Sequence, residues 1–291
     1  MQRFLVVTAD DFGLHEAVNE AVQQASHGGV LTAASLMVAA PATADAVRRA
    51  RQLPQLRVGL HLTLADGWSE LPYEAIPHLV DADGRFGSRM FVDAWRYFAS
   101  SAVRRELEAE IRAQFRAFAR TGLVLDHANA HKHFHLHPTI LALLLQVGRA
   151  FGLRAIRVPA EPLWFARRHA PIAASLSALA LAPWLQLMRR RLGAAGIAYN
   201  DHVFGIGPSG AMDEAALLGI LARLPAGATE IYLHPATHSG AVISPTMGTY
   251  RHADELAALL SPRVAAAIAA SGATRGGYLD LLRARPRAPA A

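Results

Sequence analysis

The stretch FLVVTADDFG at residues 4–13 decides the fold class. Its first half, Phe4–Thr8, is a short apolar run rich in β-branched residues, which predicts a buried strand. The following segment His15–His27 is predicted to be helical, and two consecutive glycines after it form a stop signal. Val30–Val38 then repeats the apolar strand pattern. A strand, a helix and a second strand in close succession indicate a parallel β-α architecture.

The same alternation continues along the chain and contains no internal repeat. It predicts an α/β fold of the (β/α) barrel type, TIM-barrel-like with room for irregularity, in one domain spanning 1–291 with a flexible tail after about residue 283. Further strands are predicted at Leu56–Leu64, Leu123–Leu125, Ala155–Val158 and Glu230–Leu233, and further helices at Ala42–Gln52, Arg104–Arg120, Thr139–Phe151, Glu214–Leu224 and from Ser261-Pro262.

Composition limits the chemistry. The 291 residues include 14 histidines and no cysteine, so a thiol nucleophile, an iron–sulfur cluster and a cysteine-ligated zinc site are excluded. Any metal must be held by His, Asp or Glu. The net charge of +6 comes almost entirely from scattered arginines without interleaved aromatic residues, so we expect no nucleic-acid partner.

A helical insertion is expected around 160–200. Its centre, 171–188, is uncharged and has arginines on both sides, but it contains Pro183 and polar residues, so a membrane-spanning helix is improbable. Two interpretations stay open: a helical hairpin that covers the barrel, or a lipid-facing lid with Trp164 and Trp184 at the headgroup boundary. The short apolar run at the start lacks the features of a signal peptide, so we expect a cytoplasmic protein, with peripheral contact at the inner membrane face under the second interpretation.

Acidic and histidine side chains follow the predicted strands at the end where α/β folds build their sites. Asp10 and Asp11 are adjacent carboxylates that repel each other, which a cation or a shared proton would relieve. A helix N-cap explains only one of them. His61 interrupts the apolar strand GLHLTL, and His234 ends another strand. Each histidine alone is more typical of a hydrogen-bonded core residue than of a ligand.

The strongest signal is DHANAHKHFHLHP at 126–138. If the chain stays extended there, Asn129 and the four histidines at 131, 133, 135 and 137 lie on one face. Four buried imidazoles on one face would leave polar groups unpaired, which favours a metal site. Asp/His/His ligation with an open position is typical of catalytic metal centres and of hydrolysis. The mixed nitrogen and oxygen set favours zinc as the single divalent ion, with magnesium, manganese, cobalt, nickel or iron as alternatives.

Four motifs together resemble the YdjC-like carbohydrate deacetylases: TADDFG at 8–13, GLHLT at 59–63, the alternating histidines at 131–135 and LHP at 233–235. They occur in the family's order over most of the chain. The resemblance implies a (β/α) barrel and metal-dependent removal of acetyl groups from N-acetylated amino sugars. The string at 126–138 is most similar to the hopanoid biosynthesis-associated branch, HpnK, which implies an N-acetylglucosaminyl hopanoid as substrate.

The resemblance also implies roles for single residues. Asp11, His61 and His131 would hold the metal, Asp10 would be the general base that activates water, and His234 would protonate the departing amine.

Five further residues are given supporting roles. His133 and His135 would support the ligands, contact the substrate or replace His131 as ligand. Asn129 stands where many relatives have Asp, and would orient a histidine without a charge. Arg157 and Glu161 follow another strand and would bind sugar hydroxyls or form a surface ion pair.

Alternatives to this function are a deacetylase of soluble oligosaccharides such as chitobiose, another hydrolase with a second metal, and a non-catalytic metal- or lipid-binding protein. An unliganded base such as Asp10 has no purpose in a storage protein. The sequence leaves the oligomeric state open.

Overall fold

The strands form one parallel sheet. The computed structural model describes residues 2–88, 95–98, 100–169, 172–237 and 243–284. The strands are β1 (Arg3–Phe12), β2 (Ala33–Leu36), β3 (Arg57–Leu62), β4 (Leu125–Ala130), β5 (His202–Phe204), β6 (Gly227–Leu233) and β7 (Thr274–Arg275). Their order is β4-β3-β2-β1-β6-β5, and β7 also pairs with β1. All of these pairings are parallel, as the β-α alternation predicts.

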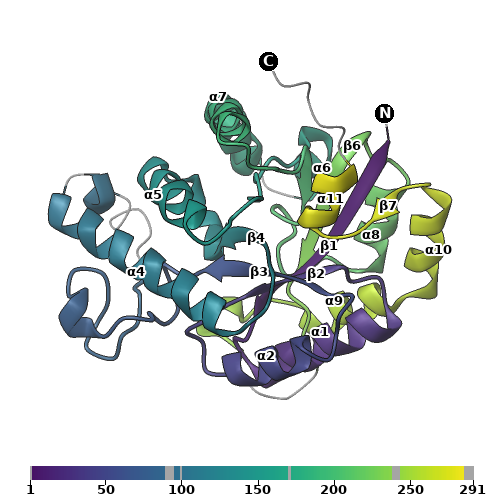
Figure 1. Ribbon diagram of the computed structural model, residues 1–291. Helices are drawn as coiled ribbons and strands as arrows, with labels where there is room; N and C mark the ends of the chain where they lie inside the picture. Colours follow the sequence, from purple (N-terminus) through teal and green to yellow (C-terminus); the bar gives the residue numbers. More distant parts are fainter. Residues whose placement is uncertain (1, 89–94, 99, 170–171, 238–242, 285–291) are drawn as a thin grey trace.

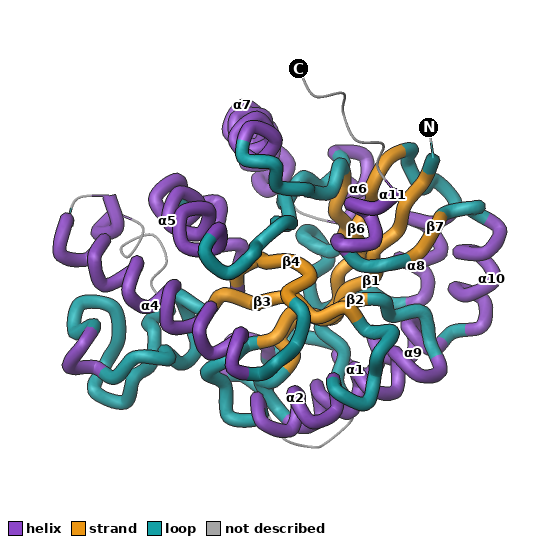
Figure 2. The backbone as a smooth tube through the Cα atoms, viewed as in Figure 1, coloured by secondary structure: helices purple, strands orange, loops and turns teal. Residues whose placement is uncertain are grey.

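Helices surround this sheet (Figures 1 and 2). They are α1 (Glu16–Gly28), α2 (Thr43–Ala50), α4 (Ser101–Arg120), α5 (Pro138–Arg149), α6 (Leu163–His169), α7 (Ile172–Ala194), α8 (Glu214–Leu221), α9 (His252–Leu260), α10 (Pro262–Ala270) and α11 (Tyr278–Ala284), with 3₁₀ turns η1 (Tyr73–Ala75), η2 (His131–Leu136) and η3 (Pro245–Met247). The arrangement is a TIM-barrel-like α/β fold. The side chain of Ser261 caps α10 and Pro262 is its first residue, as the sequence predicts.

The predicted strand Ala155–Val158 is wrong as a regular element. This segment makes only isolated bridges, from Ile156 to Ala128 and from Ala155 to Ala198. Residues 155–157 bond to the main chain of Ala128 and Ala198, and the side chain of Asn200 pairs with Val158, accepting from its amide at 2.7 Å and donating to its carbonyl at 2.8 Å. The chain still runs alongside β4 there, so Arg157 lies inside the barrel.

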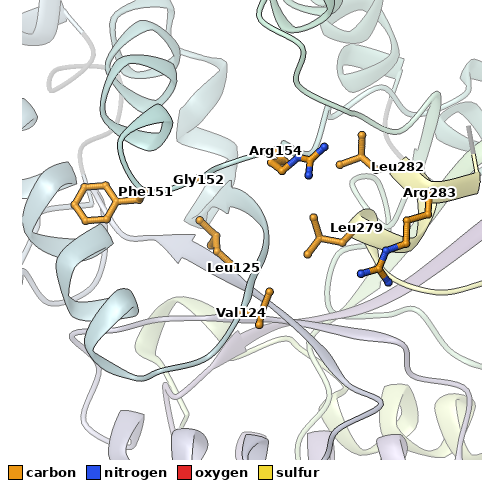
Figure 3. A pocket seen from close by; sticks show the side chains of 8 residues that line it. All are labelled: Val124, Leu125, Phe151, Gly152, Arg154, Leu279, Leu282 and Arg283. Atoms are coloured by element: carbon orange, nitrogen blue, oxygen red, sulfur yellow. The ribbon is translucent and has the colours of Figure 1, made fainter. Parts of the chain in front are cut away.

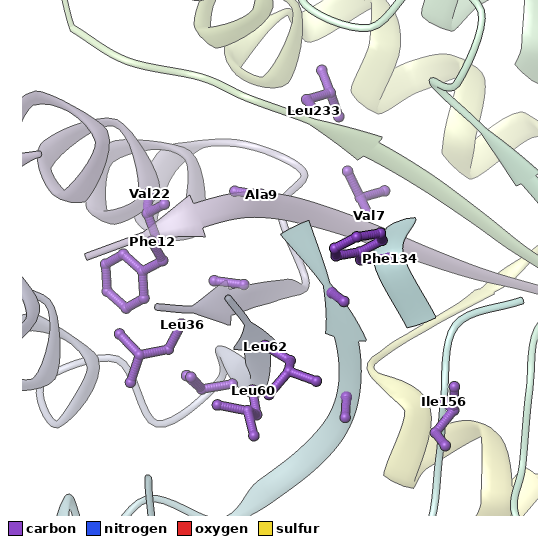
Figure 4. Packing of buried hydrophobic residues seen from close by; sticks show 14 of the residues in the cluster. Val7, Ala9, Phe12, Val22, Leu36, Leu60, Leu62, Phe134, Ile156 and Leu233 are labelled. Carbon is purple, nitrogen blue, oxygen red and sulfur yellow. The ribbon is translucent and has the colours of Figure 1, made fainter. Parts of the chain in front are cut away.

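Apolar side chains from β1, β2 and β3 pack against the helices and the η2 turn. Leu60 and Leu62 are fully buried, and truncating such a residue to alanine costs about 2–5 kcal/mol. Figure 4 shows part of this cluster, including Val7, Ala9, Phe12, Val22, Leu36, Leu60, Leu62, Phe134, Ile156 and Leu233. The core fixes the strand ends that carry the polar motifs.

The insertion at 160–200 is helical and comprises α6 and α7. The indole Nε1 of Trp184 donates to the Leu136 carbonyl at 2.8 Å, and Met188 and Leu192 are fully buried. None of the helices in the described ranges has the length and apolarity that crossing a bilayer requires. The predicted tail falls mostly on 285–291, outside the described residues.

Candidate metal centre and active site

A cavity of about 230 Å³ lies at the carboxyl ends of the strands. This is the end where TIM-barrel-like folds place their sites. Side chains from β1, β3, β6 and η2 meet there, although they are far apart in the sequence. The lining includes Asp10, His61, His131, Tyr232, His234 and Tyr250.

A β-bulge directs both adjacent carboxylates toward His61, which lines this cavity. The register between β1 and β2 shifts between Ala9 and Phe12, and Asp11 has a φ of 62°. Neighbouring residues of a regular strand point to opposite faces, so the left-handed residue is what allows Asp10 and Asp11 to face one site. A non-glycine residue there is strained, and such strain is typical of functional positions. Neither aspartate caps α1, because its N-cap is His15.

Asp11, His61 and His131 form a compact cluster of buried groups. One ligand atom from each lies within 4.8 Å of the others. Asp11 Oδ1 is 3.2 Å from His61 Nε2 and 3.0 Å from His131 Nδ1. Burial would raise the pKa of Asp11, but the two imidazoles hold it well below its usual value.

The donor set fits a divalent cation. Asn129 Oδ1 is 2.7 Å from His61 Nδ1, so that nitrogen carries a hydrogen, and in the neutral ring Nε2 presents a lone pair to Asp11. Two acceptors at 3.2 Å repel each other unless a cation or a proton lies with them. Asp11 Oδ2 is also buried without a hydrogen-bond partner among the described residues. Two imidazole nitrogens and one carboxylate are the ligands of many catalytic zinc sites.

Asp10 is held ionised by a buried ion pair. Its carboxylate accepts from Arg157 Nη1 at 2.5 Å and Nη2 at 3.0 Å. Arg157 in turn donates to Glu230 through Nε and Nη2, both at 2.8 Å. Burial would raise the pKa of Asp10, but the guanidinium, assisted by His61 and His234, holds it below its usual range. Asp10 therefore presents a negative charge beside the cluster.

His234 follows β6 on the other side of Asp11. Its Nε2 is 3.9 Å from Asp11 Oδ2. Its main chain is fixed by a donated bond to Glu255 and an accepted bond from His252 Nδ1, both 2.5 Å long. Burial lowers the pKa of His234, against the opposing effect of Asp11 and Asp10. The ring is near enough to the cavity to contact a substrate.

The expectation of an extended histidine face is wrong. Residues 131–136 form the turn η2, in which Lys132 and His133 have φ values of 53° and 56°. The histidines therefore diverge. His133 Nε2 contacts the Tyr232 hydroxyl at 3.0 Å, and His135 Nε2 donates to the Arg157 carbonyl at 3.0 Å. Neither belongs to the three-residue cluster, in which His131 takes part.

Arg157 and Glu161 have different environments from those expected. Arg157 is fully buried, so the surface ion pair is wrong, and its guanidinium is occupied by Asp10 and Glu230. Glu161 accepts from the main-chain amides of 205–207 at 2.9–3.0 Å. It therefore shapes a loop beside the cavity.

Sequence reasoning missed Glu230 and Tyr232. Glu230 is fully buried, and Tyr232 lies under the Arg157 guanidinium, 4.6 Å from ring centroid to Cζ. Both belong to β6 and are separated by Ile231. An acidic residue inside an otherwise apolar strand of a parallel sheet was the available signal, because such strands are buried on both faces.

A model of YdjC-like proteins matches residues 4–270. The chain belongs to the YdjC-like family. It is 29% identical to a carbohydrate deacetylase of Geobacillus stearothermophilus, over 94% of this chain and 95% of that protein. It is 30% identical to a chitooligosaccharide deacetylase of Serratia marcescens, over 97% of this chain and 100% of that protein. The crystal structure of an Enterococcus faecalis protein assigned to cellobiose-phosphate cleavage has the same fold, with a TM-score of 0.75, 24% identity and 97% and 99% coverage.

An apolar groove adjoins the cavity in this YdjC-like chain. Its volume is about 640 Å³, and His133 and Ile206 line both spaces. The walls come from α6, α7 and the loops that follow Val158 and Asn200. Its apolar lining includes Leu136, Leu163, Leu179, Leu181 and Leu185.

Another cavity of about 610 Å³ lies at the opposite end of β4 (Figure 3). Val124 and Leu125 line it at the start of the strand, with Arg154 and Arg283. The cluster of Asp11, His61 and His131 lies at the other end of β4, after Ala130. This cavity holds none of the residues assigned to chemistry.

Proposed function

We propose that this chain is a divalent-metal-dependent N-deacetylase that acts on N-acetylglucosaminyl sugars. The observation that carries the proposal is the cluster Asp11–His61–His131 beside an ionised Asp10 in a member of the YdjC-like family. The deacetylase names of the Geobacillus and Serratia relatives support the reaction. A divalent ion held by the cluster would polarise a carbonyl and lower the pKa of water, with zinc as first choice.

The chain's own residues would handle the protons. Asp10, fixed and ionised by Arg157, takes one proton from the attacking water. His234, in its protonated form, supplies the proton that the departing nitrogen needs. The amide C–N bond breaks, the water oxygen stays on the acyl carbon, and acetate and a free amine leave. Arg157 positions Asp10 and keeps it charged.

We further propose a lipid-linked substrate, an N-acetylglucosaminyl hopanoid. The apolar groove supports this, because it adjoins the cavity and has room for an apolar aglycone. A lipid that remains in a membrane while its sugar is processed would require peripheral contact through 171–188, where Leu179 and Leu181 are partly exposed. The relative named as a chitooligosaccharide deacetylase favours the second candidate, a soluble oligosaccharide such as chitobiose.

Acetate release from the two substrates separates these candidates. Leu181 lines the groove, whereas Leu187 of the same helix is similarly exposed and does not line it. We expect Leu181→Glu to lower kcat/KM on the hopanoid substrate by about tenfold or more and to leave diacetylchitobiose unaffected. Leu187→Glu is the matched control and should affect neither. Equal loss on both substrates, or no loss on the lipid, would reject the lipid-linked proposal.

A further inference from the structure

A line of buried polar side chains runs behind the cluster, away from the cavity. It consists of Asn129, Ser35, His127 and Asp126, all at most 1% exposed. None of them contributes a ligand atom to the cluster. They come from two strands, β2 and β4, that do not pair with each other, because β3 lies between them.

Asp126, at the end of the line farthest from the cluster, determines which groups along the line donate hydrogen bonds and which accept them. Asp126 accepts from the main-chain amides of Tyr278 and Leu279, each at 2.9 Å. Its Oδ2 is also 2.9 Å from His127 Nδ1. A carboxylate that accepts from two amides is an acceptor for the imidazole as well, so the hydrogen of His127 is on Nδ1. His127 Nε2 is then an acceptor.

The polarity continues through Ser35. Its Oγ is 3.2 Å from His127 Nε2 and must donate to it. The hydroxyl has only one hydrogen, so Ser35 Oγ accepts from Asn129 Nδ2 at 2.9 Å. The other hydrogen on Asn129 Nδ2 is directed to Asp10 Oδ1 at 3.2 Å. The contacts with Ser35 and with Asp10 therefore require the same orientation of the Asn129 amide.

This orientation decides which nitrogen of His61 is free. Asn129 Oδ1 is left to accept from His61 Nδ1, so in the neutral ring the lone pair of His61 lies on Nε2, toward Asp11. We propose that Asp126, His127, Ser35 and Asn129 form a relay of positioning residues that sets the tautomer of His61. An amide needs such a relay because, unlike a carboxylate, its two ends differ, and a flipped Asn129 would place hydrogens against His61.

A glycine makes the relay sterically feasible. Ser35 on β2 is paired in register with Gly59 on β3, and the His127 ring reaches across Gly59 toward Ser35. A Cβ on Gly59 would lie 2.5 Å from His127 Cε1. Gly59, in the GLHLT motif, thus leaves the space through which His127 on β4 reaches Ser35 on β2.

The tautomer is directly measurable by ¹⁵N NMR of histidine-labelled, metal-free protein, at a pH high enough to leave His61 neutral. We expect a single His61 species in the wild type, with hydrogen on Nδ1. Ser35→Ala should produce a mixture that includes the Nε2–H form, and His127→Phe, which removes both ring nitrogens, should act in the same direction. Thr229→Val removes another fully buried hydroxyl, outside the relay, and should leave the single species. A wild type with hydrogen on Nε2, or an unchanged single species in both relay variants, would overturn the proposal.

Metal affinity gives a second readout, which rests on the proposed metal site. Zinc binding, measured by competition with a chromophoric chelator, should be about tenfold weaker in Ser35→Ala than in the wild type and unchanged in Thr229→Val. Equal affinity in Ser35→Ala and the wild type would overturn the link between relay and ligand. A wild type that binds no zinc would instead reject the metal site, while the NMR result would still test the relay.

Discussion

Two adjacent carboxylates, Asp10 and Asp11, have different surroundings, which supports the different tasks proposed for them. Asp10 is paired with Arg157, which leaves it ionised and fixed. Asp11 faces His61 and His131 and has one oxygen without a hydrogen-bond partner in the described structure. The sequence shows that the two charges need compensation, but it cannot show which aspartate receives which partner.

The separation of tasks predicts different effects of two matched variants. Asp10→Asn should lower kcat at least about 100-fold and leave zinc stoichiometry unchanged, because the base is lost and the cluster is intact. Asp11→Asn should lose zinc together with activity. Metal analysis and acetate release measure both. Substantial activity in Asp10→Asn would contradict the proposed base.

Arg157 is predicted to be essential for stability as well. Replacing it by Met leaves Asp10 and Glu230 buried and uncompensated, which costs about 3–5 kcal/mol in the free energy of unfolding. Urea denaturation at neutral pH measures this. The control Arg263→Met removes a side chain that is 73% exposed and should barely shift the midpoint. Similar midpoints for the two variants would argue against a buried ion pair.

The raised pKa of Glu255 predicts that the free energy of unfolding depends on pH. Burial raises its pKa to about 7, from an ordinary value of 4.5. The folded protein therefore binds this proton more tightly than the unfolded chain, and the associated stabilisation is lost as pH rises through about 7. Relative to Glu255→Gln, the wild type should lose roughly 2–3 kcal/mol between pH 5 and 8. Denaturation of metal-free protein across this range tests it; a constant difference would contradict it.

At the scale of elements, the sequence predicted where the motifs lie but not how the chain turns there. Strands at Phe4–Thr8, Leu56–Leu64 and Glu230–Leu233 correspond to β1, β3 and β6, so their polar ends were expected at one edge. The turn η2 was not predictable, because its left-handed residues are Lys132 and His133 rather than glycine.

The partners of Arg157 that lie far away in the sequence could not be predicted either. Arg157 is separated by 147 positions from Asp10 and by 73 from Glu230. No local pattern encodes such pairs. The strand at Ala155–Val158 was overestimated, because its apolar residues pack in the core but form only isolated bridges, and a side chain, that of Asn200, pairs with Val158.

A substitution at Gly59 tests whether the His127 ring of β4 passes closely over β3 to reach β2. Gly59→Ala would place its Cβ against the His127 ring and should cost about 1–3 kcal/mol in unfolding free energy. Gly219 in α8 has open space around its would-be Cβ, so Gly219→Ala should leave the protein as stable or more stable. Thermal denaturation of both variants provides the comparison. A Gly59→Ala protein as stable as Gly219→Ala would contradict the close approach.

At the scale of the whole molecule, a parallel sheet collects residues from the ends of β1, β3 and β6 and from η2 into one cavity, and α6 and α7 add an apolar groove beside it. The groove is the part that the proposed lipid specificity requires. The cavity and the groove both lie at the carboxyl edge of the sheet, next to the insertion at 160–200.

The proposed function requires that the cluster of Asp11, His61 and His131 holds one catalytic divalent ion. The most direct measurement is acetate release from diacetylchitobiose and from N-acetylglucosaminyl hopanoid, by chelated protein to which zinc is returned in measured amounts. Chelation should abolish release, and activity should return in proportion to zinc, reaching a plateau at one ion per chain. Acetate release that persists after complete chelation, or a plateau that requires two ions, would contradict it.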